Sequence, residues 1–587
     1  MKERSPEQQW KAIDWLPIHK TIFKIQRRIY DAARDNQPDL VHQLQSQLVE
    51  LLPCKLLSVK RVSQDNKGKK TAGVDGKSHL SPGERYTLAS NLSLNGKADP
   101  VKRVMIPKPG TREQRLLGIP TIMDRAKQAL AKLAMEPQWE ALFESNSFGF
   151  RPGRKGADAT WRIRHKLKYG SCWVYDADIA KCFDRINHQA LLQKVNGIPV
   201  LQAQIKAWLK AGIFEKGEAF PNTGLGTPQG GVLSPLLANI ALDGAQKKIW
   251  DAVYQLTRNK KKADKVLFIR YADDFVILSP EKEWLDVAIE AVKNHIATMG
   301  LEIKPQKTRI LHTLDKENCI DGNTTFDFLG FTFSQRSVSK YKTVKLGGGK
   351  GVAQTVPVVL PSRKKIKIHF QQISKALKGN KDPLNLIREI NPILRGWRNY
   401  YKFSDSRTYG SLPGRWDSRI NVKLRHWIKR QQGKHGRNPL FWTSRGGDNW
   451  VFYANDYSKK TAKKVFLDKY SWTSWSLQAY DRITSSRSPY DGDILYWSRH
   501  SGYRTLGSGS PKREYLLRLQ GGLCALCKKA FTPNDLFHTE IGGTFGGTFD
   551  HVKPREKGGN ESWNNSQLLH KECHNSKLHS FTTVSNE

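Results

Sequence analysis

The sequence predicts an α+β protein built from several domains, and three observations carry that prediction. The chain has 587 residues, which is more than one hydrophobic core normally holds. Two apolar, β-rich runs flank an acidic turn in residues 266–278, whereas apolar residues recur at helical spacing in residues 18–48. Three of the seven cysteines gather near the carboxyl end, at positions 524, 527 and 573. We therefore expect strands and helices in separate segments, with a small metal-binding domain last.

The charge balance indicates a polyanionic partner. The chain has 97 Lys and Arg against 54 Asp and Glu, a formal net charge of +43. Such an excess is larger than solubility alone requires. Because the basic residues are spread along the whole chain, we infer a long nucleic acid that contacts most of the domains and binds more weakly as salt rises.

The sequence favours a reducing cytoplasm and no membrane partner. It contains no apolar run long enough to span a bilayer. Its first residues, MKERSPEQQW, lack the apolar core of a secretory signal. Four cysteines are scattered rather than arranged as a disulfide framework. The pattern carries no signal for oligomeric state.

The acidic turn within residues 266–278 suggests metal chemistry. The flanking runs predict a hairpin with Asp273 and Asp274 at its tip. Asp is a poor strand residue and two like charges repel, so the pair needs a cation. Two cations held by carboxylates are the usual apparatus for in-line attack on a phosphate. A solvated Asp-Asp turn is the plain alternative.

A third carboxylate is expected upstream. Residues 172–175 predict a strand, and Asp178 would stand where that strand ends beside the hairpin. Asp176 and Asp184 are rivals that composition alone does not exclude.

These two segments resemble the palm of a reverse transcriptase of the group II intron type. The resemblance is carried by D-I-A-K-C-F-D at 178–184 and Y-A-D-D at 271–274. It implies a right-hand polymerase in which Asp178, Asp273 and Asp274 hold two Mg²⁺ ions and Asp176 and Asp184 are structural neighbours. It also implies that Phe183 is an aromatic gate against a ribonucleotide 2′-hydroxyl and that Tyr271 lies at the nucleotide. A plain core aromatic is the alternative for Phe183.

The amino-terminal residues predict helices with a basic face. Apolar residues recur at spacings of three and four, with Lys24, Arg27 and Arg28 between them. An ordinary amphipathic helix with solvated charges is the alternative. T-A-G-V-D-G, at 71–76, resembles a motif near the start of the family's polymerase region.

Residues 101–125 predict a basic hairpin that can fold over a triphosphate. A strand, a Pro-Gly turn with Lys108 and a second strand from Arg115 follow one another. The family resemblance supports triphosphate contacts for both residues, although R-L-L-G-I-P replaces the commoner R-P-L-G-I-P. Next, FESNSFGFRPGRKGADA, with Arg151, Arg154 and Lys155 among glycines, resembles the family's template-binding loop.

Three later blocks complete the polymerase pattern. NTGLGTPQGG presents Gln229 and Gly230 at a helix start, and these resemble the residues that line the nascent base pair. GLEIKPQKTRI places Lys307 on a short basic strand, which matches a later nucleotide-binding block. FDFLGFTF, residues 326–333, predicts one apolar strand that closes the palm. LGGGKG, residues 346–351, then predicts a flexible break.

Residues 360–430 are again helical, with many basic and aromatic residues. The family resemblance makes these helices the thumb and the maturase domain that grips the intron RNA. Arg395, Trp397, Arg398 and Tyr400 combine guanidinium groups and rings suited to phosphate contact and base stacking, although some of the rings should pack between helices. SPYDGDILYWSRH, within residues 436–510, resembles the family's DNA-binding region.

The carboxyl end predicts a structural zinc site. Cys524 and Cys527 form one pair, and His570 and Cys573 form a second pair with the same spacing. Two such pairs supply four ligands for a tetrahedral Zn²⁺.

The segment between the two pairs resembles an HNH endonuclease, a ββα-metal fold. The resemblance rests on Asp550, His551, Asn565 and His574. In these roles His551 accepts a proton from water, Asp550 and His574 hold Mg²⁺ or Mn²⁺, and Asn565 fixes the hairpin. Adjacent strand residues point to opposite faces, so Asp550 and His551 serve one ion only if the backbone is distorted. Structural histidines are the alternative.

The whole pattern is identified as that of a group II intron-encoded protein. The expected domains are a helical extension (1–80), fingers and palm (81–345), a thumb/maturase domain (352–435), a DNA-binding region (436–510) and an HNH domain (511–587). The expected partners are intron RNA, target DNA and deoxynucleoside triphosphates. Two alternatives are a protein that only helps RNA to fold and an HNH nuclease that carries an inert polymerase.

Overall fold

The fold is described from a computed structural model. It covers residues 4–107, 114–215, 218–220, 230–319, 321–338, 355–432, 441–458, 463–476, 480, 483–484, 487–497, 515–517, 519–531, 547–554, 558–560, 562–570, 572–574 and 576–577.

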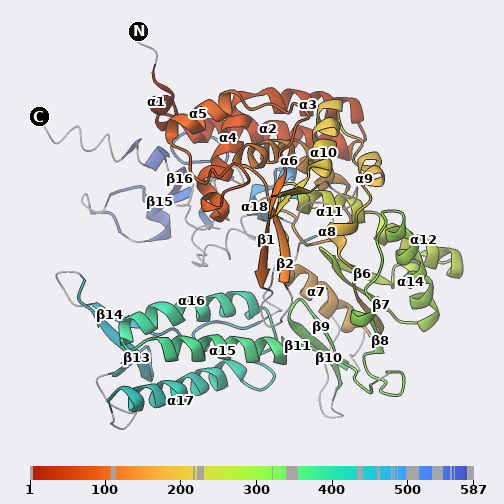
Figure 1. Cartoon of the computed structure of the whole chain (residues 1–587). Helices are drawn as coiled ribbons and strands as arrows, with labels where there is room; N and C mark the ends of the chain where they lie inside the picture. Colours follow the sequence, from red (N-terminus) through yellow and green to blue (C-terminus); the bar gives the residue numbers. More distant parts are fainter. Residues whose placement is uncertain are drawn as a thin grey trace, which may run out of the picture.

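A layer of helices forms the amino-terminal end and packs on one long helix (Figure 1). The predicted periodicity is confirmed, because Ile22, Ile25 and Ile29 are buried while Lys24 and its basic neighbours are exposed. Ser side chains cap the first and fifth helices. The helices are α1 (Pro6–Lys11), α2 (Trp15–Arg34), α3 (Pro38–Glu50), α4 (Leu52–Lys60), α5 (Pro82–Ser90) and the long α6 (Ile122–Leu142).

The predicted basic hairpin is confirmed as part of a four-stranded sheet. Its two strands pair antiparallel, with Ile106 opposite Arg115. The sheet has the order β2-β1-β4-β5. The strands are β1 (Val101–Pro107), β2 (Gln114–Ile119), β4 (Ile213–Glu215) and β5 (Glu218–Phe220).

A second four-stranded sheet lies between two hydrophobic cores. Strand alternation explains this position, because Phe275 and Ile277 face the core of the amino-terminal helices while Val276 and Leu278 face the other core. The order is β6-β7-β3-β8. The predicted hairpin of residues 266–278 is confirmed as β6 and β7. The strands are β3 (Trp173–Asp178), β6 (Leu267–Tyr271), β7 (Asp274–Ser279) and β8 (Arg309–His312).

Helices cover both faces of this sheet: α7 (Gly156–Leu167) packs on the face of the second core, and the other helices lie on the side of the first core (Figure 1). These other helices are α8 (Cys182–Arg185), α9 (His188–Val195), α10 (Pro199–Lys210), α11 (Ser234–Leu242), α12 (Ala245–Thr257), α13 (Lys260–Ala263) and α14 (Lys282–Ala297).

Two predicted strands differ from the structure. FDFLGFTF is two strands, β9 (Phe326–Phe328) and β10 (Phe331–Ser337), because Leu329 and Gly330 turn the chain with φ values of 50° and 79°. Lys307 ends a 3₁₀ turn (Pro305–Lys307) rather than lying in a strand. Strand β11 (Thr355–Pro361) completes the three-stranded sheet. The predicted break at 346–351 lies outside the described residues.

Three long helices follow and share the second core with the central sheet. They are α15 (Arg363–Gly379), α16 (Pro383–Tyr401) and α17 (Leu412–Gln432). A three-stranded antiparallel sheet packs against α16. Its strands are β12 (Trp442–Arg445), β13 (Asp448–Asp456) and β14 (Lys463–Phe466).

The segment that resembles a DNA-binding region returns to the amino-terminal helices. The Tyr490 hydroxyl donates to a carboxylate oxygen of Glu136 at 2.9 Å, and the tyrosine is buried. Trp497, in α18 (Ile494–Trp497), lies so close to Gly153 that a Cβ there would come within 2.5 Å of the ring. Both aromatic residues therefore serve as packing groups.

A third, separate core lies at the carboxyl end. It contains the two antiparallel strands β15 (Gly547–His551) and β16 (Ser566–His570). Among the described helices of the whole chain, none has the length and apolar character that a membrane span requires.

Candidate active sites

The structure brings the three predicted polymerase carboxylates to one point. Asp178, the last residue of β3, is the register partner of Asp274, the first residue of β7. Such partners have Cα atoms roughly 5 Å apart. The amide of Ile179 donates to the carbonyl oxygen of Asp273 at 3.3 Å, so the end of β3 is also joined to the turn.

A positively charged side chain already lies at this cluster. Lys307 forms an ion pair with Asp178. Burial lowers the pKa of Lys307, but the charges of Asp178, Asp274 and Asp273 outweigh burial and raise the pKa above its usual value. The acidic cluster therefore favours cations, as a magnesium site requires.

The two rival carboxylates occupy other positions. Asp176 stands opposite Val276 and Arg309 in the sheet. Burial, followed by the charges of Asp274 and other carboxylates, raises the pKa of Asp176 to about 7, although Arg309 opposes the shift. Asp184 lies on α8 and is exposed. Neither residue is paired with Asp274 in the sheet.

A buried polar group beneath the turn that carries Asp273 was not predicted. Arg270 is 1% exposed and donates from Nη1 to Asn239 Oδ1 at 2.9 Å and to the Ala272 carbonyl at 3.4 Å. Asn239 in turn donates to the Gly149 carbonyl at 2.9 Å. The turn itself needs support, because Ala272 has a φ of 59°. The sequence offered one signal for this group, because Arg270 interrupts the otherwise apolar strand β6.

The predicted template contact of Arg151 is wrong. Its guanidinium makes a two-pronged ion pair with Glu140, at 2.9 and 3.0 Å, and the residue is 5% exposed. Arg154 is also buried and donates to the Ser145 carbonyl at 2.7 Å. Burial, then the charge of Arg151, lowers the pKa of Arg154 to about 10. Both arginines hold the loop together, because their partners lie within or beside it.

The structure describes only part of the other predicted nucleotide contacts. Lys108 and Gln229 lie outside the described residues, and of Arg115 only the backbone pairing is described. Gly230 has a φ of 119°, and a Cβ there would lie 2.7 Å from the Gly118 carbonyl oxygen. The backbone at Gly230 therefore approaches β2 closely.

Two aromatic candidates lie next to the carboxylates. Phe183 is half-buried on α8, five residues after Asp178. Tyr271 is half-buried at the end of β6, opposite Asp274, and burial raises its pKa.

The predicted RNA contacts on α16 are engaged within the protein. Arg395 forms an ion pair with Asp468 at 2.5 Å, and Arg398 donates to the Lys469 carbonyl at 3.2 Å. Trp397 stacks on His369, with ring centroids 4.1 Å apart. The Tyr400 hydroxyl donates to the Leu329 carbonyl at 2.8 Å. Trp397 and Arg398 are therefore largely taken up by contacts within the protein, whereas Arg395 and Tyr400 have protein partners but remain exposed.

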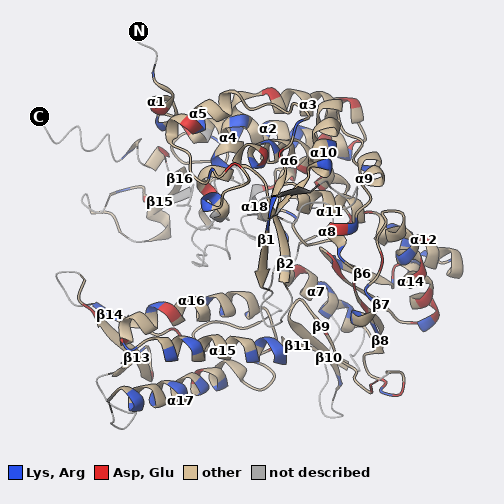
Figure 2. Cartoon of the chain, viewed as in Figure 1, with Lys and Arg blue, Asp and Glu red and all other residues tan. Residues whose placement is uncertain are grey.

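Helices α15 and α17 instead carry the exposed positive charge, which Figure 2 shows along both. Their single acidic residue, Asp417, is buried and accepts the amides of Tyr470 and Ser471 at 2.8 and 2.9 Å. Lys423 donates to Ser374 at 2.9 Å and so links the two helices. The cations are Arg363, Lys364, Lys365, Lys367, Lys375 and Lys378 on α15, and Arg415, Arg419, Lys423, Arg425, Lys429 and Arg430 on α17.

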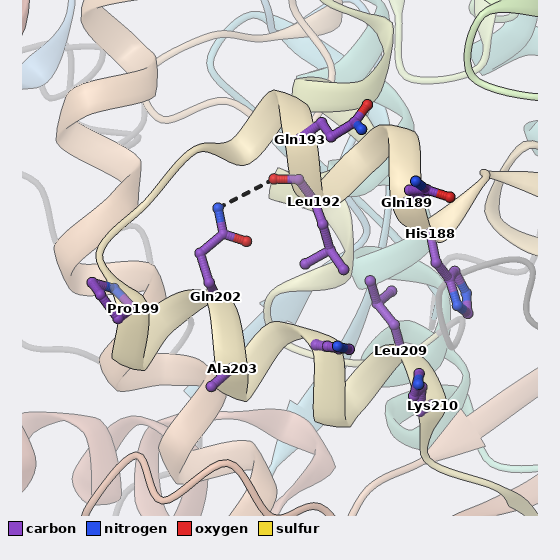
Figure 3. Close-up of a pocket in the computed structure, with 10 residues that line it drawn as sticks. His188, Gln189, Leu192, Gln193, Pro199, Gln202, Ala203, Leu209 and Lys210 are labelled. Atoms are coloured by element: carbon purple, nitrogen blue, oxygen red, sulfur yellow. Dashed lines mark hydrogen bonds between the residues drawn. The ribbon is translucent and has the colours of Figure 1, made fainter.

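A pocket of about 780 Å³ lies between α9 and α10. Figure 3 shows Gln202 directed across it to the Leu192 carbonyl, which accepts its amide at 3.2 Å. The wall is otherwise formed by apolar and long polar side chains, with Lys206 and Lys210 from α10. None of the predicted site residues lines this pocket, so the catalytic candidates lie elsewhere.

The four predicted zinc ligands come together at the carboxyl end. The ligand atoms of Cys524, Cys527, His570 and Cys573 all lie within 4.8 Å of one another. The Cys527 sulfur lies 3.2 Å from His570 Nδ1. Three sulfurs and one ring nitrogen form a donor set suited to Zn²⁺.

The predicted nuclease residues lie beside this cluster. His574 Nε2 is 3.9 Å from an Asp550 oxygen, so the two side chains lie close enough to contact one ion. The strand register is regular at Asp550 and His551, so the side chains of these adjacent residues leave opposite faces. Asn565 accepts the Lys553 amide at 2.9 Å and donates to its carbonyl at 3.1 Å, which fixes the hairpin as predicted.

Lys577 is a further residue of this site that was not predicted. Its ammonium donates to an Asp550 oxygen at 2.6 Å and to the His551 carbonyl at 3.2 Å. Its position on the helical segment after His574 was the only signal in the sequence.

Known protein families match four segments of the chain. The N-terminal domain of reverse transcriptase matches residues 10–92, and reverse transcriptase (RNA-dependent DNA polymerase) matches residues 106–333. The group II intron, maturase-specific domain matches residues 363–444, and HNH endonuclease matches residues 542–580.

Curated proteins are similar over much of the same region. Protein YkfC of Escherichia coli (strain K12) is 30% identical over 343 residues, which cover 51% of this chain and 84% of that protein. Group II intron-encoded protein LtrA of Lactococcus lactis subsp. cremoris is 28% identical over 373 residues, covering 51% of this chain and 60% of that protein. Maturase-like protein 1 of Euglena gracilis is 25% identical over 407 residues, with 67% and 78% covered.

The chain belongs to the group II intron-encoded proteins.

Membership in this family assigns activities to the described parts. The polymerase match includes both central strands that bear Asp178 and Asp274, and the maturase match includes α15, α16 and α17. The nuclease match includes β15 and β16. This group II intron protein is therefore a reverse transcriptase, a maturase and an HNH endonuclease, and its fold is mixed α and β with separate polymerase and nuclease domains.

Gly149→Ala tests the support of the catalytic turn. A Cβ at Gly149 would lie 2.3 Å from the Ala272 amide nitrogen, so the turn that carries Asp273 must move. We expect primer extension to fall by about 100-fold, because a displacement of about 1 Å at a reacting centre has that effect. Steady-state primer extension on an RNA template measures it.

Gly396→Ala is the matched control, because a Cβ there meets nothing within 4 Å and the residue lies inside α16. Extension by the control should equal that of the unmodified protein. Equal extension by Gly149→Ala would contradict the close contact beneath the turn.

Proposed function

We propose that Asp178, Asp273 and Asp274 form the polymerase centre of this intron protein. The observation that carries the proposal is the register pairing of Asp178 with Asp274 at the ends of β3 and β7. Two Mg²⁺ ions bound by these carboxylates would activate the primer 3′-hydroxyl and stabilise the leaving pyrophosphate. The protein's own part is to hold three oxygen-donating side chains on two adjacent strands, where burial of the sheet restricts their movement.

The nucleotide would be positioned by residues around this centre. Lys108 and Arg115 of the β1–β2 hairpin would contact the triphosphate, and Gln229 and Gly230 would line the nascent base pair. The closeness of Gly230 to Gly118 supports the placement of Gly230 beside β2. Lys307 at the carboxylates, Phe183 as the sugar gate and Tyr271 at the nucleotide complete the proposed set.

The RNA-binding face of the maturase would be the α15–α17 surface. It consists of exposed Lys and Arg on two helices whose single carboxylate is buried. Phosphate contacts of this kind supply most of the affinity for RNA and weaken as salt rises. The aromatic residues of α16 would keep these helices together.

The nuclease centre would combine Asp550 and His574 as ligands of one Mg²⁺ or Mn²⁺. His551 would act there as the base that accepts a proton from water only once the backbone of β15 turns at Asp550 and His551, since the regular register leaves the two side chains on opposite faces. The 3.9 Å separation of His574 from Asp550 supports the ligand pair. Asn565 would hold the hairpin, and a Zn²⁺ on Cys524, Cys527, His570 and Cys573 would hold the domain together. Zinc contributes directly to the folding of domains this small.

The activities would serve intron mobility in the cytoplasm. The protein would bind intron RNA and assist its splicing, and the nuclease would nick target DNA to leave a 3′-hydroxyl. The polymerase would extend that end with deoxynucleoside triphosphates. We propose the domain limits 1–80, 81–345, 352–435, 436–510 and 511–587. The family matches follow the same order, although those at 10–92 and 363–444 run past the proposed limits at 80 and 435.

The double variant Asp273→Asn/Asp274→Asn tests the polymerase centre. We expect primer extension to fall by at least about 1,000-fold, since the metal-binding charge is lost. Nicking and splicing should be retained, because the nuclease residues lie in a separate core. Extension, nicking and splicing are measured on one preparation. Loss of nicking would contradict separate sites, and retained extension would contradict the carboxylate assignment.

Charge removal on the thumb tests the RNA face. The variant Lys367→Gln/Lys375→Gln/Lys429→Gln should weaken intron RNA binding by about tenfold or more and reduce the slope of log K against log salt by about 2. The reason is that three phosphate contacts no longer release counterions. Filter binding over a salt series gives both quantities.

The matched control is Arg388→Gln/Arg395→Gln/Arg398→Gln, which removes the same charge from α16. These arginines lie beside Asp456 and Asp468. The control should leave the salt slope nearly unchanged. A larger slope change in the control than in the α15–α17 variant would place the RNA on α16 instead.

A further inference from the structure

Phe150 is an exposed aromatic residue held in an unfavourable backbone conformation. Its φ is 60°, in the left-handed region that bulky side chains rarely adopt. The residue is 52% exposed, although its neighbours Phe148 and Arg151 are both buried. Strain of this kind persists only where the surrounding structure imposes it, and it concentrates at functional sites.

Both neighbours of Phe150 are anchored. On one side, the Gly149 carbonyl accepts the Asn239 amide at 2.9 Å, and Gly149 packs directly on Ala272. On the other side, Arg151 is fixed to Glu140 by its two-pronged ion pair. The backbone between these anchors therefore has little freedom, and it holds the Phe150 ring at the surface rather than in the core.

The displayed ring meets the proposed sugar gate. The ring centroids of Phe150 and Phe183 are 6.3 Å apart, and the planes cross at 78°, an edge-to-face contact. Aromatic pairs favour this geometry. Phe150 thus contacts α8, which follows Asp178, while the glycine before it contacts the turn that carries Asp273.

We propose that Phe150 is a positioning residue that fixes the ring of Phe183 and thereby sets the selection of deoxyribonucleoside over ribonucleoside triphosphates. The proposal rests on the proposed role of Phe183 as the gate. The Phe183 ring excludes a ribonucleotide only if it keeps its position when a 2′-hydroxyl approaches it. Phe183 is only half-buried, so a second ring packed against it adds a contact that fixes its position.

The test is sugar selection by Phe150→Gly. Glycine accepts a φ of 60° without strain, so this change removes the ring and leaves the loop conformation favourable. Single-nucleotide extension with dTTP and with UTP gives kcat/KM for each. We expect the ratio of kcat/KM for dTTP to kcat/KM for UTP to fall by about tenfold, which is the effect of losing one packing contact in a pocket. The ratio should fall because kcat/KM for UTP rises, while kcat for dTTP changes little.

Two further variants make the outcome specific. Phe150→Tyr keeps the ring and should keep the ratio. Phe183→Ala should lower the ratio at least as far as Phe150→Gly, and the double variant should be no worse than Phe183→Ala alone, because both changes act on one gate.

The possible failures are distinguishable. An unchanged ratio in Phe150→Gly together with a lowered ratio in Phe183→Ala overturns the role of Phe150 and leaves the gate intact. An unchanged ratio in Phe183→Ala overturns the gate itself. Additive effects in the double variant, or loss of dTTP incorporation in a Phe150→Gly protein that still nicks DNA, also overturn the proposal.

Discussion

The polymerase half of the structure depends on the pairing of two carboxylates across adjacent strands. Like charges directly opposite each other destabilise a sheet, so Asp178 and Asp274 oppose folding at the point where the chemistry takes place. Two features offset this cost. Lys307 forms an ion pair with Asp178, and the rest of β3 and β7 is buried on both faces between two cores. A site that is unfavourable without a cation is well suited to bind one.

The surroundings of this pair are built to prevent movement. Arg270 and Asn239 tie the turn after β6 to the loop at Gly149, and Arg151 ties the same loop to α6 through Glu140. Buried charge of this kind is costly unless it is well satisfied, and it is retained where a fixed geometry matters. Further along the chain, Tyr490 returns to α6 and Trp497 packs on Gly153, so residues far apart in sequence hold the same body together.

The sequence predicted those site residues whose chemistry is unusual for their position. Its predictions failed for residues whose side-chain partner is distant in the sequence. Adjacent aspartates at a strand turn and two spaced Cys/His pairs have few structural explanations, and both groups converge in the structure. A surface arginine and a buried one look the same in sequence. Arg151 was therefore assigned to nucleic acid, although it is buried and paired with Glu140. Phe326–Phe333 was predicted as one strand because a left-handed Leu329 has no clear sequence signal.

The most direct measurement of the central claim is iron-directed cleavage of the chain. When Fe²⁺ replaces Mg²⁺ in the presence of ascorbate and peroxide, radicals cut the backbone close to the bound ion. The account predicts cuts near Asp178 and near Asp273 that appear together, are suppressed together by excess Mg²⁺, and are both lost in Asp178→Asn. Cuts near Asp273 that persist at full strength in Asp178→Asn would contradict a shared site.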